Sequence, residues 1–539
     1  MNLLHDLFDA SANRFPNNEA LRSRGHSTTY AELQRRSHSL AAALRSHGVG
    51  RGDRVAVYLQ NRAEVVETAL ACSRIGALYV PANPLLKARQ LEYLLNDAGA
   101  CALIASQTAA VVVEDSIPRC PTITTVVWCD AAQVRAPASP NIDVLHYEAM
   151  VTGDVRVAGP AVEDDPAALL YTSGSTGRAK GVVVSHRNLV SGAHTVAGYL
   201  HNTSGDRILV ALPLSFDYGL SQVTTAFAVG ACAVLTHFSL AAALLQEIVA
   251  ERITALAGVP TMWMHLATAE WPAAAVKTLR YITNSGGALP VSVIRNLQSR
   301  LPNTLIYCMY GLTEAFRSTY LEPAKLEQHL GSMGKAIPGQ EVLVLNPDGS
   351  ECEPGEIGEL VHRGSLVTLG YWNDPQLTQQ RFKPLPKRLQ QLMREEIGVY
   401  SGDLVRTDAE GYIYFIGRRD HLIKSSGYRI SPSEIEEVIA ELPTVIESVA
   451  LGIPDDALGQ RIVVAAVVSP QAPLEMADRI RQHCRVQLPA YMVPAEVHVM
   501  SHLPRNANGK SDRAALTATL SQAPQEQLPV IRAAGRGAR

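Results

Sequence analysis

Short apolar runs recur between about Asp53 and Tyr310, and their alternation with longer amphipathic stretches is the feature that most constrains the fold. The runs are Val55–Leu59, Leu78–Pro81, Cys101–Ala105, Thr124–Cys129, Ile208–Pro213, Cys232–Thr236, Ile253–Pro260, Tyr281–Thr283 and Leu305–Met309. Short continuous apolar runs are typical of buried strands, and helices between successive strands favour parallel pairing. The sequence therefore predicts an α/β fold with stacked, largely buried sheets.

The pattern changes after Gly331 and again near Gly417. Closely spaced turn formers, such as Pro338-Gly339 and Pro354-Gly355, separate alternating runs at 341–345 and 359–362, which predicts the hairpins of a β subdomain. Beyond Gly417 the pattern predicts helices at 434–442 and 475–487 and strands at 449–453, 462–468 and 497–500. We therefore predict a large N-terminal domain over 1–417, a small α+β domain over 421–520 and a disordered tail over 521–539.

Size and charge bound the function. A chain of 539 residues with 47% hydrophobic content can bury several layers, and a net charge of −3 without a long basic run argues against nucleic-acid binding. The N-terminus has no basic segment before its apolar residues, and no apolar run is long enough to span a bilayer. Eight scattered cysteines show no metal-type pairs. These features favour a cytoplasmic protein that acts on small molecules.

The stretch 170–185, LYTSGSTGRAKGVVVS, reads as strand, glycine-rich loop and strand. Gly174 and Gly177 would let the backbone approach a ligand, and the hydroxyls of four neighbours could contact a polyphosphate: Thr172, Ser173, Ser175 and Thr176. Lys180 would add positive charge. The loop is not a Walker sequence, because the segment after it is strand-like. By itself the stretch is also compatible with an ordinary polar hairpin.

Five motifs in order make the chain resemble the superfamily of adenylate-forming ligases over nearly its whole length. They are YTSGSTGRAKG at Tyr171, YGLTEA at Tyr310, YSGDLVRTD at Tyr400, GRRDHLIKSSGYRISPSEIE at Gly417 and LPRNANGKSDR at Leu503. The resemblance implies an enzyme that joins a carboxylate to the α-phosphate of ATP with Mg²⁺, releases pyrophosphate and passes the acyl group to a thiol. It also implies a mobile C-terminal domain.

The resemblance assigns a nucleotide site to the N-terminal domain. Glu314 would help to hold Mg²⁺, and Tyr310, followed by Gly311 and Thr313, offers a flat face for adenine. Gly286, Gly287 and Ala288 in the stretch SGGAL would let backbone line the base. Asp403 can accept two hydrogen bonds from the ribose hydroxyls. Arg418 would approach the ribose and the phosphates.

The C-terminal residues would serve two reactions in turn. By resemblance, Lys510 bridges the carboxylate and the α-phosphate during adenylation, and Lys424 and Gly427 act when a thiol replaces AMP. Asp420, in the connecting segment 418–420, matches the family's hinge. A small change in its φ and ψ would swing the whole domain.

The identity of the acid rests on fewer residues. Asp217, in the sequence Phe216-Asp217-Tyr218, matches an aspartate that pairs with the α-ammonium group in amino-acid-activating members, although an aspartate there could also cap a helix. Arg317 could pair with Asp217 or bind a second carboxylate. Ser285 and Met309 complete the predicted acid pocket.

The nearest resemblance joins two groups: stand-alone ligases that load an amino acid such as proline onto a carrier protein, and AMP-forming acyl ligases associated with exosortase clusters. The stretches VPANPLLKARQ, LSFDYGL, MYGLTEAFRSTYL and LPAYMVP carry it. We predict an amino-acid ligase whose acceptor is a carrier-protein phosphopantetheine thiol. A CoA-dependent synthetase for a fatty or other organic acid, and an inactive nucleotide-binding scaffold, remain alternatives.

Overall fold

The computed structural model describes residues 3–130, 142–173, 179–237, 240–386, 395–419, 422–425, 428–455, 458–488, 490–506 and 509–522. The chain divides into two compact units, Met1–Phe415 and Ile416–Arg539, and a smaller, separate core lies within the second. No helix in these described ranges is both long and apolar enough to cross a membrane.

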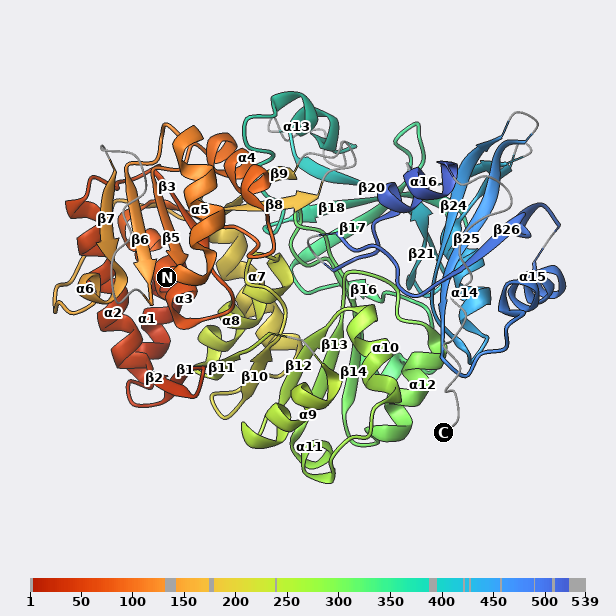
Figure 1. The fold of residues 1–539 in the computed structure, drawn as a ribbon, viewed down its shortest axis with the longest axis horizontal. Coiled ribbons are helices and arrows are strands. Elements are labelled where there is room, and N and C mark those ends of the chain that lie inside the picture. Colours follow the sequence, from red (N-terminus) through yellow and green to blue (C-terminus); the bar gives the residue numbers. More distant parts are fainter. Residues whose placement is uncertain are drawn as a thin grey trace, which may run out of the picture. The chain divides into compact units, whose positions relative to one another are not determined.

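Two sheets of mainly parallel strands make up most of the first unit's framework (Figure 1). The seven-stranded sheet has the order β7 (Asp143–His146), β6 (Thr125–Cys129), β5 (Ala102–Ser106), β3 (Arg54–Tyr58), β4 (Leu78–Pro81), β8 (Pro166–Ser173) and β9 (Ala179–Ser185). The nine-stranded sheet has the order β16 (Lys335–Ala336), β15 (Thr319–Leu321), β14 (Leu305–Tyr310), β13 (Tyr281–Asn284), β12 (Ala255–Gly258), β10 (Arg207–Val210), β11 (Cys232–Leu235), β1 (Glu19–Ser23) and β2 (His26–Thr29). Each of the nine predicted runs coincides with one of these strands within a few residues. The predicted α/β class is confirmed.

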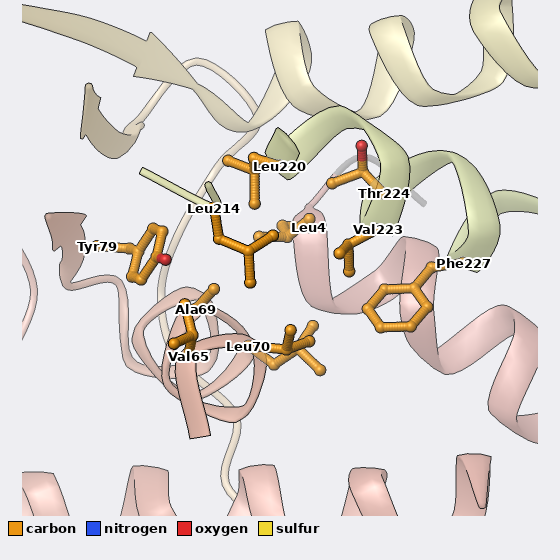
Figure 2. A pocket seen from close by; sticks show the side chains of 11 residues that line it. Leu4, Val65, Ala69, Leu70, Tyr79, Leu214, Leu220, Val223, Thr224 and Phe227 are labelled. Carbon is orange, nitrogen blue, oxygen red and sulfur yellow. The ribbon is translucent and has the colours of Figure 1, made fainter. Parts of the chain in front are cut away.

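One large core joins the facing sides of the two sheets. It draws residues from α1 (Leu4–Arg14), α2 (Tyr30–Ser46), α3 (Ala63–Ile75), α7 (His186–Tyr199) and α8 (Asp217–Val229). One side of α8, with Leu220, Val223, Thr224 and Phe227, closes a small apolar cavity against α1 and α3 (Figure 2). Tyr218 lies on the opposite side of the helix, because it precedes Leu220 by two positions and each position turns the helix by about 100°.

The outer faces of the sheets are covered by other helices. Against the seven-stranded sheet lie α4 (Ala88–Ala98) and α5 (Ala110–Ser116), and α6 (Tyr147–Met150) follows β7. Against the nine-stranded sheet lie α9 (Ala241–Ala250), α10 (Pro260–Thr268), α11 (Ala273–Thr278) and α12 (Val291–Arg300). This is how a buried parallel sheet satisfies its two apolar faces.

The predicted β subdomain is an antiparallel sheet. Its order is β17 (Gln340–Leu345), β18 (Ile357–Gly364), β20 (Ile397–Thr407) and β19 (Phe382–Pro384), with β21 (Ile413–Arg418) paired to β20 and α13 (Pro375–Arg381) before β19. All eight cysteines of the chain are free, and six of them, including Cys308 of β14, are buried.

The second unit is the predicted small α+β fold. Its sheet has the order β23 (Tyr428–Ile430), β22 (Ile423–Ser425), β25 (Gly459–Val468) and β24 (Val445–Asp455), with β26 (Glu496–Met500) parallel to β25. The helices are α14 (Pro432–Ala440), α15 (Met476–Gln487) and α16 (Arg513–Gln522). Because α16 reaches Gln522 and buries Leu516 and Leu520 in the core, the prediction that a disordered tail begins at 521 was wrong for its first two residues. Residues 523–539 lie outside the described ranges.

Candidate active site

The glycine-rich stretch forms a strand–loop–strand hairpin, as predicted. Strands β8 and β9 are antiparallel, and Thr172 pairs with Lys180 and Ser173 with Ala179 at the open end. The residues between them, which include Gly174, Ser175, Thr176 and Gly177, and the side chain of Ser173 lie outside the described part of the chain. The hairpin therefore presents Thr172 and Lys180 on either side of the loop.

Tyr371 links this hairpin to Glu314. Its backbone forms an isolated antiparallel bridge with Val182 of β9, and its hydroxyl donates a hydrogen bond of 2.5 Å to Oε1 of Glu314. The main-chain carbonyl of Glu314 accepts two further bonds of 3.0 Å, from the amide and the hydroxyl of Thr368. The backbone and the carboxylate of Glu314 are thus both held, and Tyr371 connects the carboxylate to β9.

Tyr310 and Asp403 meet at the end of β14. The Tyr310 hydroxyl donates a 2.5 Å hydrogen bond to Oδ2 of Asp403, and its ring is stacked on His362 with centroids 6.0 Å apart. Asp403 is 5% exposed, and its amide donates to the hydroxyl of Ser401. The pairing of β18 and β20 shifts register here, and Gly402 has a φ of +74°. A bulge of this kind re-aims a side chain, here the carboxylate of Asp403.

The SGGAL stretch follows β13 as a fixed loop. The Asn284 side-chain amide donates to the Gly287 carbonyl at 3.0 Å, and the Ser285 amide donates to the Gly258 carbonyl at 3.3 Å. Gly286 has a φ of +83°, which favours glycine. Gly287 and Ala288 are exposed, whereas Ser285 is buried. Exposed backbone held in this way suits a flat base.

Two of the predicted acid-binding residues, Phe216 and Arg317, contact Tyr218. The guanidinium carbon of Arg317 lies 4.3 Å from the centre of the Tyr218 ring, and the Tyr218 hydroxyl is hydrogen-bonded to Thr283 of β13 at 2.5 Å. Phe216 makes an edge contact with Tyr218, with centroids 6.3 Å apart. Thr283 precedes Ser285 by two residues. Met309, on the next strand, accepts a hydrogen bond from Tyr199 at 3.1 Å.

Asp217 does not cap α8. It is the first residue of the helix and only 4% exposed, whereas Phe216 holds the N-cap position without a side-chain hydrogen bond. Capping side chains act from the position before the helix, so the capping alternative was wrong. A carboxylate in the first turn does interact favourably with the helix dipole.

The C-terminal candidates occupy the second unit. Lys510 is exposed on a tight turn, in which the Asn506 amide donates to the Lys510 carbonyl at 2.8 Å and the Lys510 amide donates to the Asn506 side chain at 3.1 Å. Arg418 ends β21, and Lys424 pairs with Arg429 across β22 and β23. Asp420, Gly427 and the side chain of Lys424 are not among the residues that the structure describes.

His362, Thr368 and Tyr371 were not predicted as site residues from the sequence. Both ring nitrogens of His362 are buried and have no hydrogen-bond partner among the described residues, and burial lowers the pKa of His362 to about 3. The ring is therefore neutral near pH 7.

For Tyr371, the sequence offered one indication, its position in a Gly-Tyr-Trp turn. Its hydrogen bond to Glu314 joins residues that are 57 positions apart.

Two family models match the chain. The model for AMP-binding enzyme covers residues 8–372, and the model for AMP-binding enzyme C-terminal domain covers residues 434–510. The chain belongs to the AMP-binding enzyme family, and the predicted resemblance is confirmed. It is an adenylate-forming, AMP-forming ligase.

Individual relatives span nearly the whole chain. A feruloyl-CoA synthase from Amycolatopsis is 32% identical over 500 residues, which is 92% of this chain and 94% of that protein. An L-proline–[L-prolyl-carrier protein] ligase from Pseudomonas fluorescens is 30% identical over 524 residues, covering 96% and 99%. The o-succinylbenzoate CoA synthetase of Bacillus subtilis, solved with its acyl-adenylate intermediate, is 28% identical with a TM-score of 0.79, covering 95% and 97%. The same synthetase has been solved with ATP and magnesium.

Proposed function

We propose that this protein activates an amino acid as an acyl-adenylate, with release of pyrophosphate, and transfers the acyl group to the phosphopantetheine thiol of a carrier protein. The adenylation class follows from the family. The amine-bearing acid and the carrier-protein acceptor are the proposed parts. The carrier-protein ligase among the relatives supports them.

In the first step, an oxygen of the acid's carboxylate bonds to the α-phosphorus of ATP, and the bond from that phosphorus to pyrophosphate breaks. Both reactants are anions, so the site must neutralise charge and hold them in line. We assign this role to Lys180 and Lys510. Tyr310, Asp403, Gly287 and Ala288 would position the nucleoside.

Glu314 is our candidate for the magnesium carboxylate. Among the described residues, no group of three or more His, Cys, Asp or Glu side chains could hold a metal by itself. Mg²⁺ at such sites is usually held by one or two carboxylates together with substrate phosphates, so the donor set at Glu314 fits it. When bound, the ion would neutralise phosphate charge, while Tyr371 keeps the Glu314 carboxylate oriented.

In the second step, a thiol sulfur attacks the acyl carbonyl, AMP leaves through cleavage of the carbonyl–oxygen bond, and the thiol proton passes to solvent. Lys424 and Gly427 are our candidates for this half-reaction. The alternative acceptor is CoA, which the feruloyl-CoA synthase among the relatives favours. The cytoplasmic location also stays a prediction.

The observation that carries the amino-acid proposal is the placement of Asp217. Its carboxylate belongs to a residue only 4% exposed, in the turn that also supplies Tyr218 to the predicted acid pocket. A carboxylate held in a largely buried position can form a strong ion pair with the ammonium group of an amino acid.

A carboxylate panel tests the function. Purified protein would be given Mg·ATP, hydroxylamine and single acids, and pyrophosphate release would be measured for amino acids, fatty acids and aryl acids. We expect release with one or a few amino acids. Release only with unsubstituted fatty acids would contradict the amino-acid proposal, and silence from folded protein across the panel would favour the scaffold alternative. Addition of CoA or a phosphopantetheinylated carrier protein then identifies the acceptor by the AMP formed without hydroxylamine.

A further inference from the structure

Among the residues that the structure describes, Arg317 is a buried cation without an anionic partner. The residue is 2% exposed, and within the described ranges its guanidinium makes one long hydrogen bond, 3.5 Å from Nη1 to the Phe316 carbonyl. Its Nε and Nη2 atoms have no hydrogen-bond partner in the described part of the chain. Burying an unpaired charge is among the most costly arrangements in a protein interior.

The other two buried arginines of the described chain are paired. Arg74 donates to both carboxylate oxygens of Asp9, at 2.8 and 2.7 Å. Arg62 binds both Glu64 and Asp130. Because this chain supplies acids to its structural arginines, the missing acid at Arg317 is a specific feature of its site.

The backbone holds Arg317 in place without an acid. Phe316, fully buried, has a φ of +53°, a left-handed conformation that is costly for a bulky residue. A side chain at Gly311 would lie 2.6 Å from the Phe316 carbonyl oxygen, so the loop is closely packed around this turn. The guanidinium carbon lies over the Tyr218 ring, 4.3 Å from its centre, which is a cation–π distance. Strain of this kind is concentrated at ligand sites.

The two unpartnered atoms form one edge of the guanidinium. The N–H bonds of Nε and Nη2 point the same way and match the two oxygens of a carboxylate. The reacting carboxylate is a poor candidate, because a bidentate pair would occupy both of its oxygens and leave neither to attack phosphorus. We propose that the activated acid carries a second carboxylate and that Arg317 binds it through this edge.

This proposal rests on the proposed function and narrows its substrate class. Together with the ammonium group of the proposed function, a second carboxylate makes the preferred substrate an amino-dicarboxylic acid. Arg317 thereby becomes a specificity-determining residue. Its charge selects among acids and takes no part in bond formation.

One competing partner is an internal water. Ser318 Oγ and both nitrogens of His362 also lack partners, and they line the same small cavity as Arg317. A water there would make two to four hydrogen bonds. In that case the water would accept the hydrogen bonds of the Arg317 guanidinium, and replacement of Arg317 would not change which acids are used.

The test compares acids of equal length. Pyrophosphate release would be measured for glutamate against norvaline, aspartate against 2-aminobutyrate and glutarate against valerate, with the parent enzyme, R317M, R317K and the control S318A. We expect kcat/KM of the parent to favour the diacid of at least one pair by about a hundredfold or more. R317M should bring that ratio close to one. R317K should leave an intermediate ratio, because lysine keeps the positive charge but lacks the two parallel N–H donors of the guanidinium. S318A should keep the parent's ratio.

Binding and folding are measured beside activity. The melting temperature of the parent enzyme should rise more when the diacid is added than when the monoacid of the same pair is added. R317M should lose this difference, and its circular dichroism spectrum should match that of the parent enzyme. An unchanged diacid preference in R317M, or a parent that uses only the monoacids, would overturn the proposal and leave the proposed function standing. An equal loss for both acids of every pair would mean that Arg317 holds the reacting carboxylate and would also overturn it. No release with any acid would overturn the proposed function and this inference together.

Discussion

At the scale of single residues, the two predicted acid-binding residues of opposite charge, Asp217 and Arg317, are both neighbours of Tyr218. Tyr218 follows Asp217 in α8, and Arg317 stacks on the Tyr218 ring. Arg317 makes no ion pair with Asp217, so the two charges do not cancel each other directly. A ligand with an ammonium group and a second carboxylate would complement both.

Removal of the Asp217 carboxylate should act on substrate choice. If it pairs with the substrate's ammonium group, D217A leaves that cation unpaired and should cost about 3–5 kcal/mol of transition-state stabilisation, which is roughly a hundred- to several-thousandfold in kcat/KM. The amino acid and its analogue with hydrogen in place of the amine would be compared in pyrophosphate release, with D217N as the matched variant. For the analogue, kcat/KM should be low with the parent enzyme and nearly unchanged in D217A. Equal loss with both acids would contradict the pairing.

The two lysines should separate the half-reactions. K510A should slow adenylate formation far more than transfer from preformed adenylate, and K424A should do the reverse, because the family resemblance assigns them to different steps. Single-turnover measurements with acid plus ATP, and with synthetic acyl-adenylate plus thiol, distinguish the steps. Similar damage to both steps in both variants would contradict this division.

At the scale of elements, the first turn of α8 fits against backbone, and this fit fixes Asp217 and Tyr218. A Cβ at Gly219 would lie 2.1 Å from the Pro213 carbonyl oxygen and 2.8 Å from that of Leu212. Neither backbone atom can move aside without moving the helix. The glycine therefore sets the distance between α8 and the end of β10.

Replacing a glycine by alanine should have opposite effects on the free energy of unfolding in α7 and in α8. G219A should lower the free energy of unfolding by about 1–3 kcal/mol or more through overpacking, and should impair acid activation. G198A is the matched control, since Gly198 is exposed in α7 and an added Cβ meets nothing within 4 Å. It should stabilise the protein by about 0.5–1 kcal/mol, because alanine favours the helix. Chemical denaturation of both variants checks the pair, and a neutral G219A would contradict the packing argument.

The local sequence pattern was sufficient to predict most helices and strands, but not what they pack against. Strands such as β4 and β13 could be predicted because an apolar run bounded by turn residues specifies a buried strand on its own. Helix α16 was missed because its apolar residues, Leu516 and Leu520, form a sparse pattern whose meaning depends on the packing against β24. The alternative role of Asp217 as a helix cap was wrong for a similar reason, since a shift of one position changes a cap into a first-turn residue.

The candidate site was predictable where a motif carries the residue and unpredictable where tertiary contact does. Glu314 and Asp403 stand in recognisable motifs. Their hydrogen-bonding partners, Tyr371 and Tyr310, come from segments 57 and 93 positions away, and sequence spacing gives no measure of such contacts. The missing partner of Arg317 likewise becomes evident only when every neighbour is in place.

At the scale of the whole molecule, buried neutral histidines make stability depend on pH. Burial lowers the pKa of His362 to about 3 and, with the charge of His5 adding to the effect, that of His186 to about 4. In the unfolded chain a histidine binds a proton below about pH 6.5. Between these values the unfolded state binds more protons, so acid favours unfolding, and the stabilisation is complete only above pH 6.5.

The variant H362L isolates one of these contributions. The free energy of unfolding of the parent should fall more steeply below pH 6.5 than that of H362L, by up to about 1.4 kcal/mol per pH unit toward pH 4. Urea denaturation at several pH values from 7.5 to 4.5 measures the difference of slopes, which removes the titration of other groups common to both proteins. Parallel curves would show that His362 is protonated in the folded state.

The burial of the cysteines bears on a hazard that such an enzyme creates for itself. An acyl-adenylate is a mixed anhydride, and any thiolate nearby would capture the acyl group. Burial raises the pKa of every one of the eight cysteines, to about 12 for Cys308, which is two residues from Tyr310. These groups stay as unreactive thiols at neutral pH. Burial therefore protects the cysteine thiols of this chain from capturing the acyl group of an adenylate formed beside them.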